Sequence, residues 1–99
     1  MATKAAYYGT KPPTMLKGAA SLDFPSIAAA GQHELTIAVT GAAVGDAVVL
    51  APPAALTAGL IANARVTAPG TVTIRLANIT AAAIDPAAAT WGVRVIKAS

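Results

Sequence analysis

Residues 33–40, HELTIAVT, and residues 71–76, TVTIRL, decide the fold class, because apolar and polar side chains alternate along both. The apolar positions are Leu35, Ile37, Val39, Val72, Ile74 and Leu76. A period of two residues is typical of a β-strand that has one face in the core and the other in water. Both stretches are therefore predicted to be half-buried antiparallel strands.

Further strands are predicted on either side of these two. Their ranges are 22–27, 47–51, 60–67 and 91–97. Residues 47–51, AVVLA, form an all-apolar run too short for a helix, and we interpret it as a strand buried on both faces. The turn sequence of residues 68–70, APG, joins two of the strands and predicts a β-hairpin. Trp91 lies on the inward face of the last strand and is expected in the core.

The connections between these strands carry little helical signal. Residues 54–59 have room for one helical turn. In residues 77–90 the alanines favour a helix, but Pro86 restricts Asp85 away from the helical region, so no long helix is expected. Short strands separated by turn signals predict an all-β fold, an antiparallel β-sandwich or jelly-roll-like domain over residues 21–99.

Residues 1–20 differ from the rest and are predicted to form an extended N-terminal arm. Two adjacent prolines fix an extended backbone there, and no strand or helix period is visible. Its lysines carry the whole net charge of +3, because the charges of residues 23–99 cancel. Such an arm either is solvated and aids solubility or docks on an acidic protein surface, with the adjacent tyrosines as an apolar anchor. The candidate interaction residues are Lys4, Tyr7, Tyr8, Lys11 and Lys17.

Composition favours one small domain that associates with itself. The chain has 99 residues, and its hydrophobic fraction of 56% includes 27 alanines. Only 28 larger apolar side chains remain to build a core, and alanine-rich segments with few polar groups lie at 54–58, 81–83 and 87–89. We therefore expect a homo-oligomer.

The polar residues do not form a recognisable catalytic or metal site. Ser26, His33 and Asp46 have the residue types of a catalytic triad, but Ser26 lacks the glycines of a nucleophile elbow. His33 and Glu34 are adjacent on a strand, so they point to opposite faces. There is no cysteine and no phosphate-binding loop. We predict no enzymatic activity, no metal and no cofactor.

Nucleic acid and membranes are not expected as partners either. The lysines of residues 1–20 are too few and too dispersed for a nucleic-acid arm. Arginines 65, 75 and 94 lie on three separate predicted strands, where they either form a basic stripe or act as solubilising charges. Glycines and prolines interrupt the weakly charged stretch 39–63, so it does not resemble a membrane span.

A resemblance gives a more specific expectation. It rests on residues 21–56, SLDFPSIAAAGQHELTIAVTGAAVGDAVVLAPPAAL, and on residues 68–97, APGTVTIRLANITAAAIDPAAATWGVRVIK. These stretches resemble a small β domain of tailed-bacteriophage virion proteins, and the chain looks most like a head decoration (cement) protein. The most telling pieces are VTGAAVGDAVVL with its two following prolines, the strand TVTIRLANIT and the ending AIDPAAATWGVRVI.

The resemblance implies a function as well as a fold. A decoration protein of this kind is a homotrimer that is assembled in the host cytoplasm and sits on the capsid exterior. It binds the major capsid protein and stabilises the head by bridging neighbouring capsomers. The alternative is a tail-fibre or spike-associated module that contacts a host surface or carbohydrate. Neither role brings a catalytic signature onto this chain.

Overall fold

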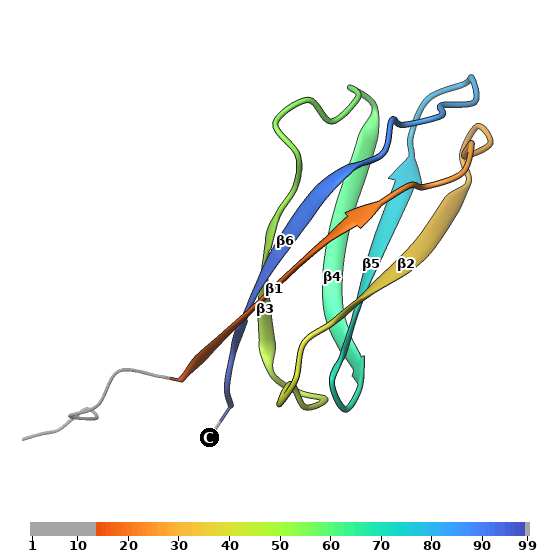
Figure 1. Ribbon diagram of the computed structural model, residues 1–99. Helices are drawn as coiled ribbons and strands as arrows, with labels where there is room; N and C mark the ends of the chain where they lie inside the picture. The colour runs from red at the N-terminus through yellow and green to blue at the C-terminus, as the bar shows by residue number, and fades with distance from the viewer. Residues whose placement is uncertain (1–13, 99) are drawn as a thin grey trace, which may run out of the picture.

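The computed structural model describes residues 14–98, and this part of the chain contains six β-strands and no helix (Figure 1). The strands are β1 (Met15–Leu22), β2 (Gln32–Ala38), β3 (Ala47–Ala51), β4 (Leu60–Ala68), β5 (Thr71–Asn78) and β6 (Ala89–Ile96). The predicted all-β class is therefore confirmed. The strands predicted from the alternating stretches correspond to β2 and β5.

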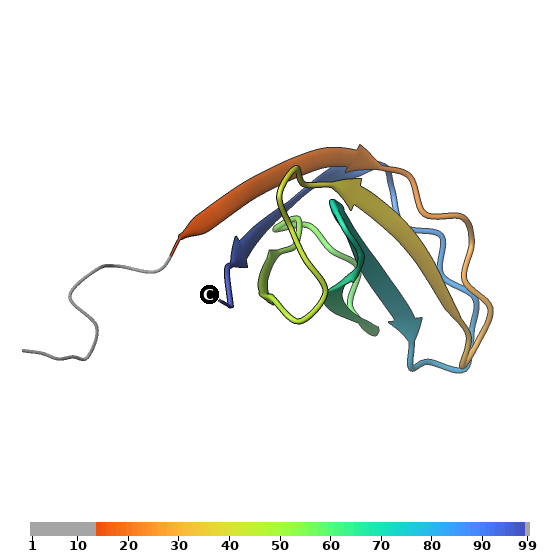
Figure 2. The ribbon, with the colours of Figure 1, turned by 90° about the horizontal axis from the view of Figure 1, so that it is seen from below.

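The strands form two antiparallel three-stranded sheets, in the orders β1-β6-β3 and β2-β5-β4. Figures 1 and 2 show β1 and β6 side by side, with the chain crossing between the sheets at the ends of the strands. Only β4 and β5 follow each other within one sheet, and they form the predicted hairpin. Its turn contains Gly70 at φ 75°, a left-handed conformation that glycine adopts without strain.

The core lies between the two sheets and is built from the inward positions of each strand. From the first sheet come Trp91, Val93 and Val95, and from the second come Ile37, Val72, Ile74 and Leu76. Phe24, in the β1–β2 connection, meets Trp91 edge-on with ring centroids 5.5 Å apart. The inward positions predicted for β5 and the core position predicted for Trp91 are confirmed.

Strand β1 corrects the predicted boundary of the arm. Residues 15–20 were expected in an extended arm, but they pair with β6 along the whole of β1. The inward residues of this segment are Leu16, Gly18 and Ala20. A Cβ atom on Gly18 would lie only 2.5 Å from Cγ2 of Val39, so the sheets approach each other closely at this point. Small inward residues leave room for this close approach. Because they are small, β1 lacks the alternation of large apolar and polar residues that would have predicted a strand.

Three other expectations need correction. Residues 22–27 are not a strand: β1 ends at Leu22, and Ile27 makes only an isolated bridge to Ile84. Strand β3 has the predicted range 47–51, but among the strands of residues 14–98 it pairs only with β6, and it is an edge strand with an exposed outer face. Residues 54–59 form turns rather than a helical turn.

Candidate docking surface

The outward side chains of the β1-β6-β3 sheet form a surface of small, apolar and basic residues, which we call the docking face. It is defined by three rows of residues that lie opposite one another across the strands: Met15, Ile96 and Ala47; Lys17, Arg94 and Val49; Ala19, Gly92 and Ala51. These residues alternate with the inward core positions of the same strands. The row of alanines and glycine makes the surface flat, because no side chain there extends beyond a methyl group.

Two cations lie side by side on the docking face. Lys17 on β1 is directly opposite Arg94 on β6, and both side chains are exposed. Within residues 14–98 neither makes a recorded ion pair, and the three rows contain no acidic residue. Apolar side chains flank the pair, since Met15 is 52% exposed and Val49 is 54% exposed. This face thus presents positive charge and apolar contact beside a flat row of alanine and glycine.

The outer face of the β2-β5-β4 sheet, which we call the ion-paired face, is organised in the opposite way. Glu34 on β2 receives hydrogen bonds from Arg75 on β5, with Nε and Nη2 each 2.8 Å from Oε2. Arg65 on β4 approaches the same oxygen at 3.6 Å. The Arg75 hydrogen bond is the main cause that lowers the pKa of Glu34 from its ordinary value of 4.5. Arg65 and Arg75 therefore share one face, while Arg94 lies on the other sheet, and the three arginines form no single stripe.

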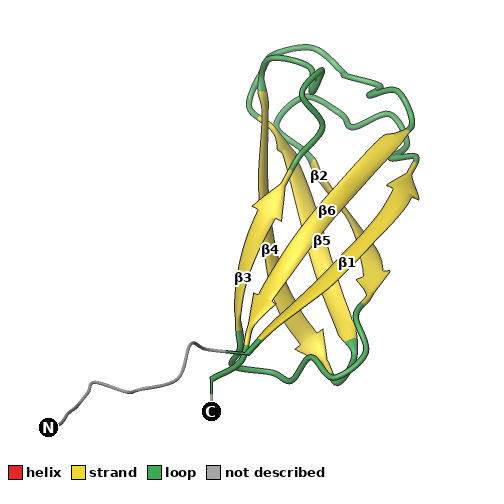
Figure 3. Ribbon diagram, turned by 60° about the vertical axis from the view of Figure 1, so that its left-hand side comes forward, coloured by secondary structure: helices red, strands yellow, loops and turns green. Residues whose placement is uncertain are grey.

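Asp46 anchors the end of the molecule where β3 begins. Its Oδ2 lies 2.6 Å from Nζ of Lys97 and accepts a hydrogen bond from the N–H of Ala43, while Oδ1 accepts one from the N–H of Ala98. Lys97 also donates to the carbonyl oxygen of Gly41. The Lys97 hydrogen bond is the main cause that lowers the pKa of Asp46 to about 2. Figure 3 shows β6 ending at this same end, so Asp46 fastens residues 97–98 to the β2–β3 connection.

Asn78 organises the opposite end, and the sequence analysis did not identify it. Its buried Nδ2 donates to the carbonyl oxygens of Ile27 and Ala82, at 3.0 and 2.8 Å. Its Oδ1 accepts from the N–H and the hydroxyl of Thr80, at 2.9 and 2.7 Å. An Asn two residues before a Thr at the end of a strand is a signal for such a turn, which could have revealed it.

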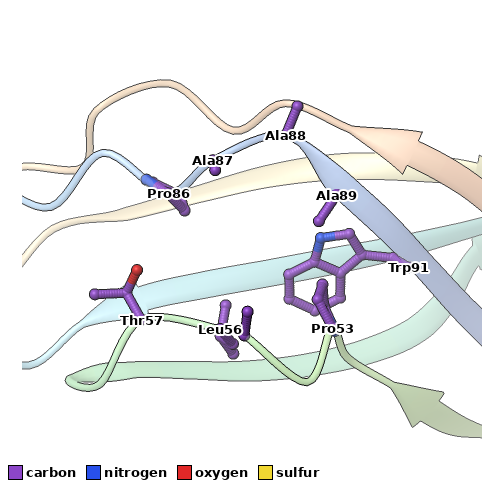
Figure 4. A pocket seen from close by; sticks show the side chains of 9 residues that line it. Pro53, Leu56, Thr57, Pro86, Ala87, Ala88, Ala89 and Trp91 are labelled. Atoms are coloured by element: carbon purple, nitrogen blue, oxygen red, sulfur yellow. The ribbon is translucent and has the colours of Figure 1, made fainter.

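A small pocket lies at this end as well, between the β3–β4 connection and the residues before β6 (Figure 4). It has a volume of about 160 Å³ and is lined by Pro53, Ala55, Leu56, Thr57, Pro86, Ala87, Ala88, Ala89 and Trp91. The Trp91 indole forms one wall, but the side chain is only 2% exposed and belongs to the core. The lining offers a hydroxyl and an indole N–H and no acid, base or thiol, so the pocket has no groups for proton transfer.

The predicted site residues fall into two groups. Lys4, Tyr7, Tyr8 and Lys11 lie outside the described residues, whereas Lys17 lies on the docking face. The structure does not assemble Ser26, His33 and Asp46: His33 is near the start of β2 against Phe24, and Asp46 follows the far end of that strand. The docking face also contains residues that were not predicted as site residues, namely Arg94, Met15 and Val49. Sequence reasoning missed them because the order of the strands determines which residues lie side by side.

Other kinds of site receive no support from the described residues. Residues 14–98 bring together no three His, Cys, Asp or Glu side chains that could hold a metal ion. No helix in this part of the chain is long and apolar enough to cross a membrane. Comparison with family models, with curated proteins and with solved structures finds no significant match to this chain.

Proposed function

We propose that the chain is a structural virion protein, a head decoration (cement) protein of a tailed bacteriophage without catalytic activity. It binds the major capsid protein on the capsid exterior and stabilises the head by bridging neighbouring capsomers. The observation that carries the proposal is the docking face, where Lys17 and Arg94 lie side by side on a flat surface without an acidic residue. The resemblance of residues 21–97 to phage virion domains supplies the identity of the partner.

The docking face suits a flat protein surface that carries acidic residues. Alanine and glycine lose little side-chain entropy when they are covered, and they let another backbone approach closely. The two cations complement acidic groups, and Met15 and Val49 add apolar area on either side. Two cations are few for nucleic acid, since a typical protein–DNA contact neutralises about 6–10 phosphates.

The finer description of the fold belongs to the same proposal. The first four strands alternate between the sheets, and the returning strands β5 and β6 insert between them, β5 between β2 and β4 and β6 between β1 and β3. This strand order supports a β-sandwich with a jelly-roll-like path. Residues 1–13 are proposed as an arm whose Lys4, Tyr7, Tyr8 and Lys11 contact a neighbouring subunit or the capsid. The assembly is a homotrimer that forms in the host cytoplasm.

The experiment locates the protein in the virion. Virions of the phage that encodes the chain are separated into heads and tails on a density gradient, and each fraction is probed with antibody against the purified protein. Signal in the heads, at several copies per capsomer junction, supports the proposal. Signal confined to tails or fibres overturns it in favour of the tail-fibre or spike module, and absence from purified virions overturns both.

A further inference from the structure

The two sheets have four edge strands, and one of them contains no charged side chain, bulge or proline within its length. Edge strands expose unpaired backbone groups and are normally guarded by charged side chains, bulges or prolines. Strand β1 contains Lys17 and β2 contains Glu34, while β4 contains Arg65 and a bulge between Val66 and Ala68. Strand β3, AVVLA, has no charged or polar side chain along its length. Within residues 14–98 no strand is hydrogen-bonded to its outer edge, which can therefore accept another strand.

The side chains of β3 also remain partly uncovered. Val48 and Leu50 point toward the core but are only half-buried, whereas the inward residues Val93 and Val95 of the central strand β6 are fully buried. Val49, on the outer side, is 54% exposed. Another strand beside β3 would satisfy its free backbone groups and cover these apolar side chains.

We propose that β3 pairs with β3 of a second copy of this chain, antiparallel, about a two-fold axis that passes through Val49. The strand is complementary to itself in this register, and the opposed residues are alanine with alanine, valine with leucine, and valine with valine. Directly opposed residues of antiparallel strands lie on the same face, so core-facing residues meet core-facing residues. A two-fold contact requires this kind of self-complementary surface.

The contact creates one continuous six-stranded sheet, in the order β1-β6-β3-β3-β6-β1. Both docking faces then lie on the same side, so one flat surface carries two copies of Lys17 and Arg94. No charged side chain of β3 is buried in the process, because the strand has none. The inference goes beyond the proposed function and does not depend on it, since a two-fold contact can also link copies that belong to neighbouring trimers.

The first test measures the mass of the full chain by sedimentation equilibrium over a range of concentrations. We expect the wild-type mass to reach an even multiple of 9.7 kDa, two copies for the pair alone or six for two paired trimers, and the Val49→Lys variant to reach half that mass. Two lysines would face each other across the two-fold axis and repel. Met15→Lys is the matched control, because Met15 lies on the same face with nearly the same exposure but on the opposite edge strand. A wild-type monomer, an odd multiple, or an unchanged Val49→Lys mass overturns the proposal.

A second test does not depend on whether Val49→Lys folds. The chain has no cysteine, so Val49→Cys introduces a single thiol. Opposed Cα atoms of antiparallel strands lie about 4.5–5.5 Å apart, within the range that a disulfide spans. Mild oxidation should convert Val49→Cys into a covalent dimer and leave Met15→Cys largely monomeric. Equal yields for the two variants would overturn the two-fold pairing, whatever the location of the protein in the virion.

Discussion

The docking face and the ion-paired face are outer surfaces of two similar three-stranded sheets, yet they differ in whether their basic side chains have an acidic partner. On the ion-paired face, Arg75 and Arg65 approach one oxygen of Glu34, so the charged groups interact with each other. On the docking face, Lys17 and Arg94 lie beside each other without an acidic residue in their rows. The proposed capsid partner would account for this difference, because acidic groups on its surface would compensate the two adjacent cations.

The largest expected effect comes from reversing the charges of the docking face. The double variant Lys17→Glu, Arg94→Glu should lower affinity for undecorated heads roughly a hundredfold or more, because acidic groups of the partner would then face like charges. Stability should change little, since both side chains are exposed. Binding is measured by co-sedimentation with heads, and stability by urea unfolding.

The ion-paired face supplies the control for this prediction. Arg65→Gln removes an exposed cation whose contact with Glu34 is 3.6 Å long. Head binding should remain within about twofold of wild type, because exposed ion pairs contribute little and this face is not the one that docks. If Arg65→Gln weakened binding as much as the double charge reversal, the comparison between the two faces would be wrong.

The next effect concerns the position of β1 beneath the docking face. Gly18→Ala places a Cβ atom 2.5 Å from Cγ2 of Val39, so β1 or Val39 must move. We expect a loss of about 1–3 kcal/mol of unfolding free energy, the usual cost of overpacking a core. Urea unfolding of Gly18→Ala, Val39→Ala and the double variant measures the coupling. The glycine substitution should cost less in the Val39→Ala background, and equal costs in both backgrounds would refute the steric explanation.

The same glycine explains what the sequence could and could not predict. The alternation of large apolar residues predicted β2 and β5, because those strands use valine, isoleucine and leucine on one face, and the turn sequence of residues 68–70 predicted the β4–β5 hairpin. Strand β1 has Leu16, Gly18 and Ala20 on its inward face, so its sequence shows almost no alternation of large apolar and polar residues. The need for small residues comes from Val39 in the other sheet, and a local pattern contains no information about it.

The candidate site was less predictable than the fold. Lys17 was identified as an interaction residue from charge alone, but its neighbour Arg94 depends on the pairing of β1 with β6 across 77 residues of sequence. The ion pair between Asp46 and Lys97 depends on the same kind of long-range contact. The hydrogen bond that Asp46 accepts from the N–H of Ala43, in contrast, joins residues only three positions apart and is therefore a local contact. Sequence reasoning thus found residue types but not the partners that give them a function.

A smaller effect tests whether the flatness of the docking face matters. A Cβ atom on Gly92 would meet only ordinary contacts, the nearest being Cβ of Ala51 at 3.6 Å. Gly92→Ala should therefore raise the unfolding free energy by up to about 0.5–1 kcal/mol, because alanine loses less backbone freedom on folding than glycine. Head binding should weaken several-fold, since the new methyl group fills the space above the Gly92 backbone between Ala19 and Ala51, where the partner is expected to approach most closely. Opposite changes in stability and binding are the expected signature, and unchanged binding would mean that the row is not covered by a partner.

The smallest expected effect concerns stability in acid, and it distinguishes the docking face from the carboxyl groups elsewhere in the fold. Among its three rows, the docking face has no carboxylate or imidazole to protonate. Glu34 and Asp46, in contrast, have folded-state pKa values below their ordinary values of 4.5 and 3.8. A carboxyl group with a lowered pKa stabilises the fold above its unfolded-state value, and that contribution is lost as the pH falls through the folded-state value.

The contribution of Asp46 should therefore be complete above about pH 4 and disappear toward pH 2, because its folded-state pKa is about 2. Thermal unfolding of the wild type and of Asp46→Asn, measured from pH 7 to pH 2, tests this window. The variant should be less stable at pH 7, because Lys97 and the N–H groups of Ala43 and Ala98 lose their carboxylate, and the two curves should converge near pH 2. Asp23→Asn, which replaces an exposed carboxyl group after β1, is the control for the loss of one negative charge. Curves for Asp46→Asn and wild type that stay parallel down to pH 2 would show that the Lys97 contact does not hold the C-terminal end of the fold.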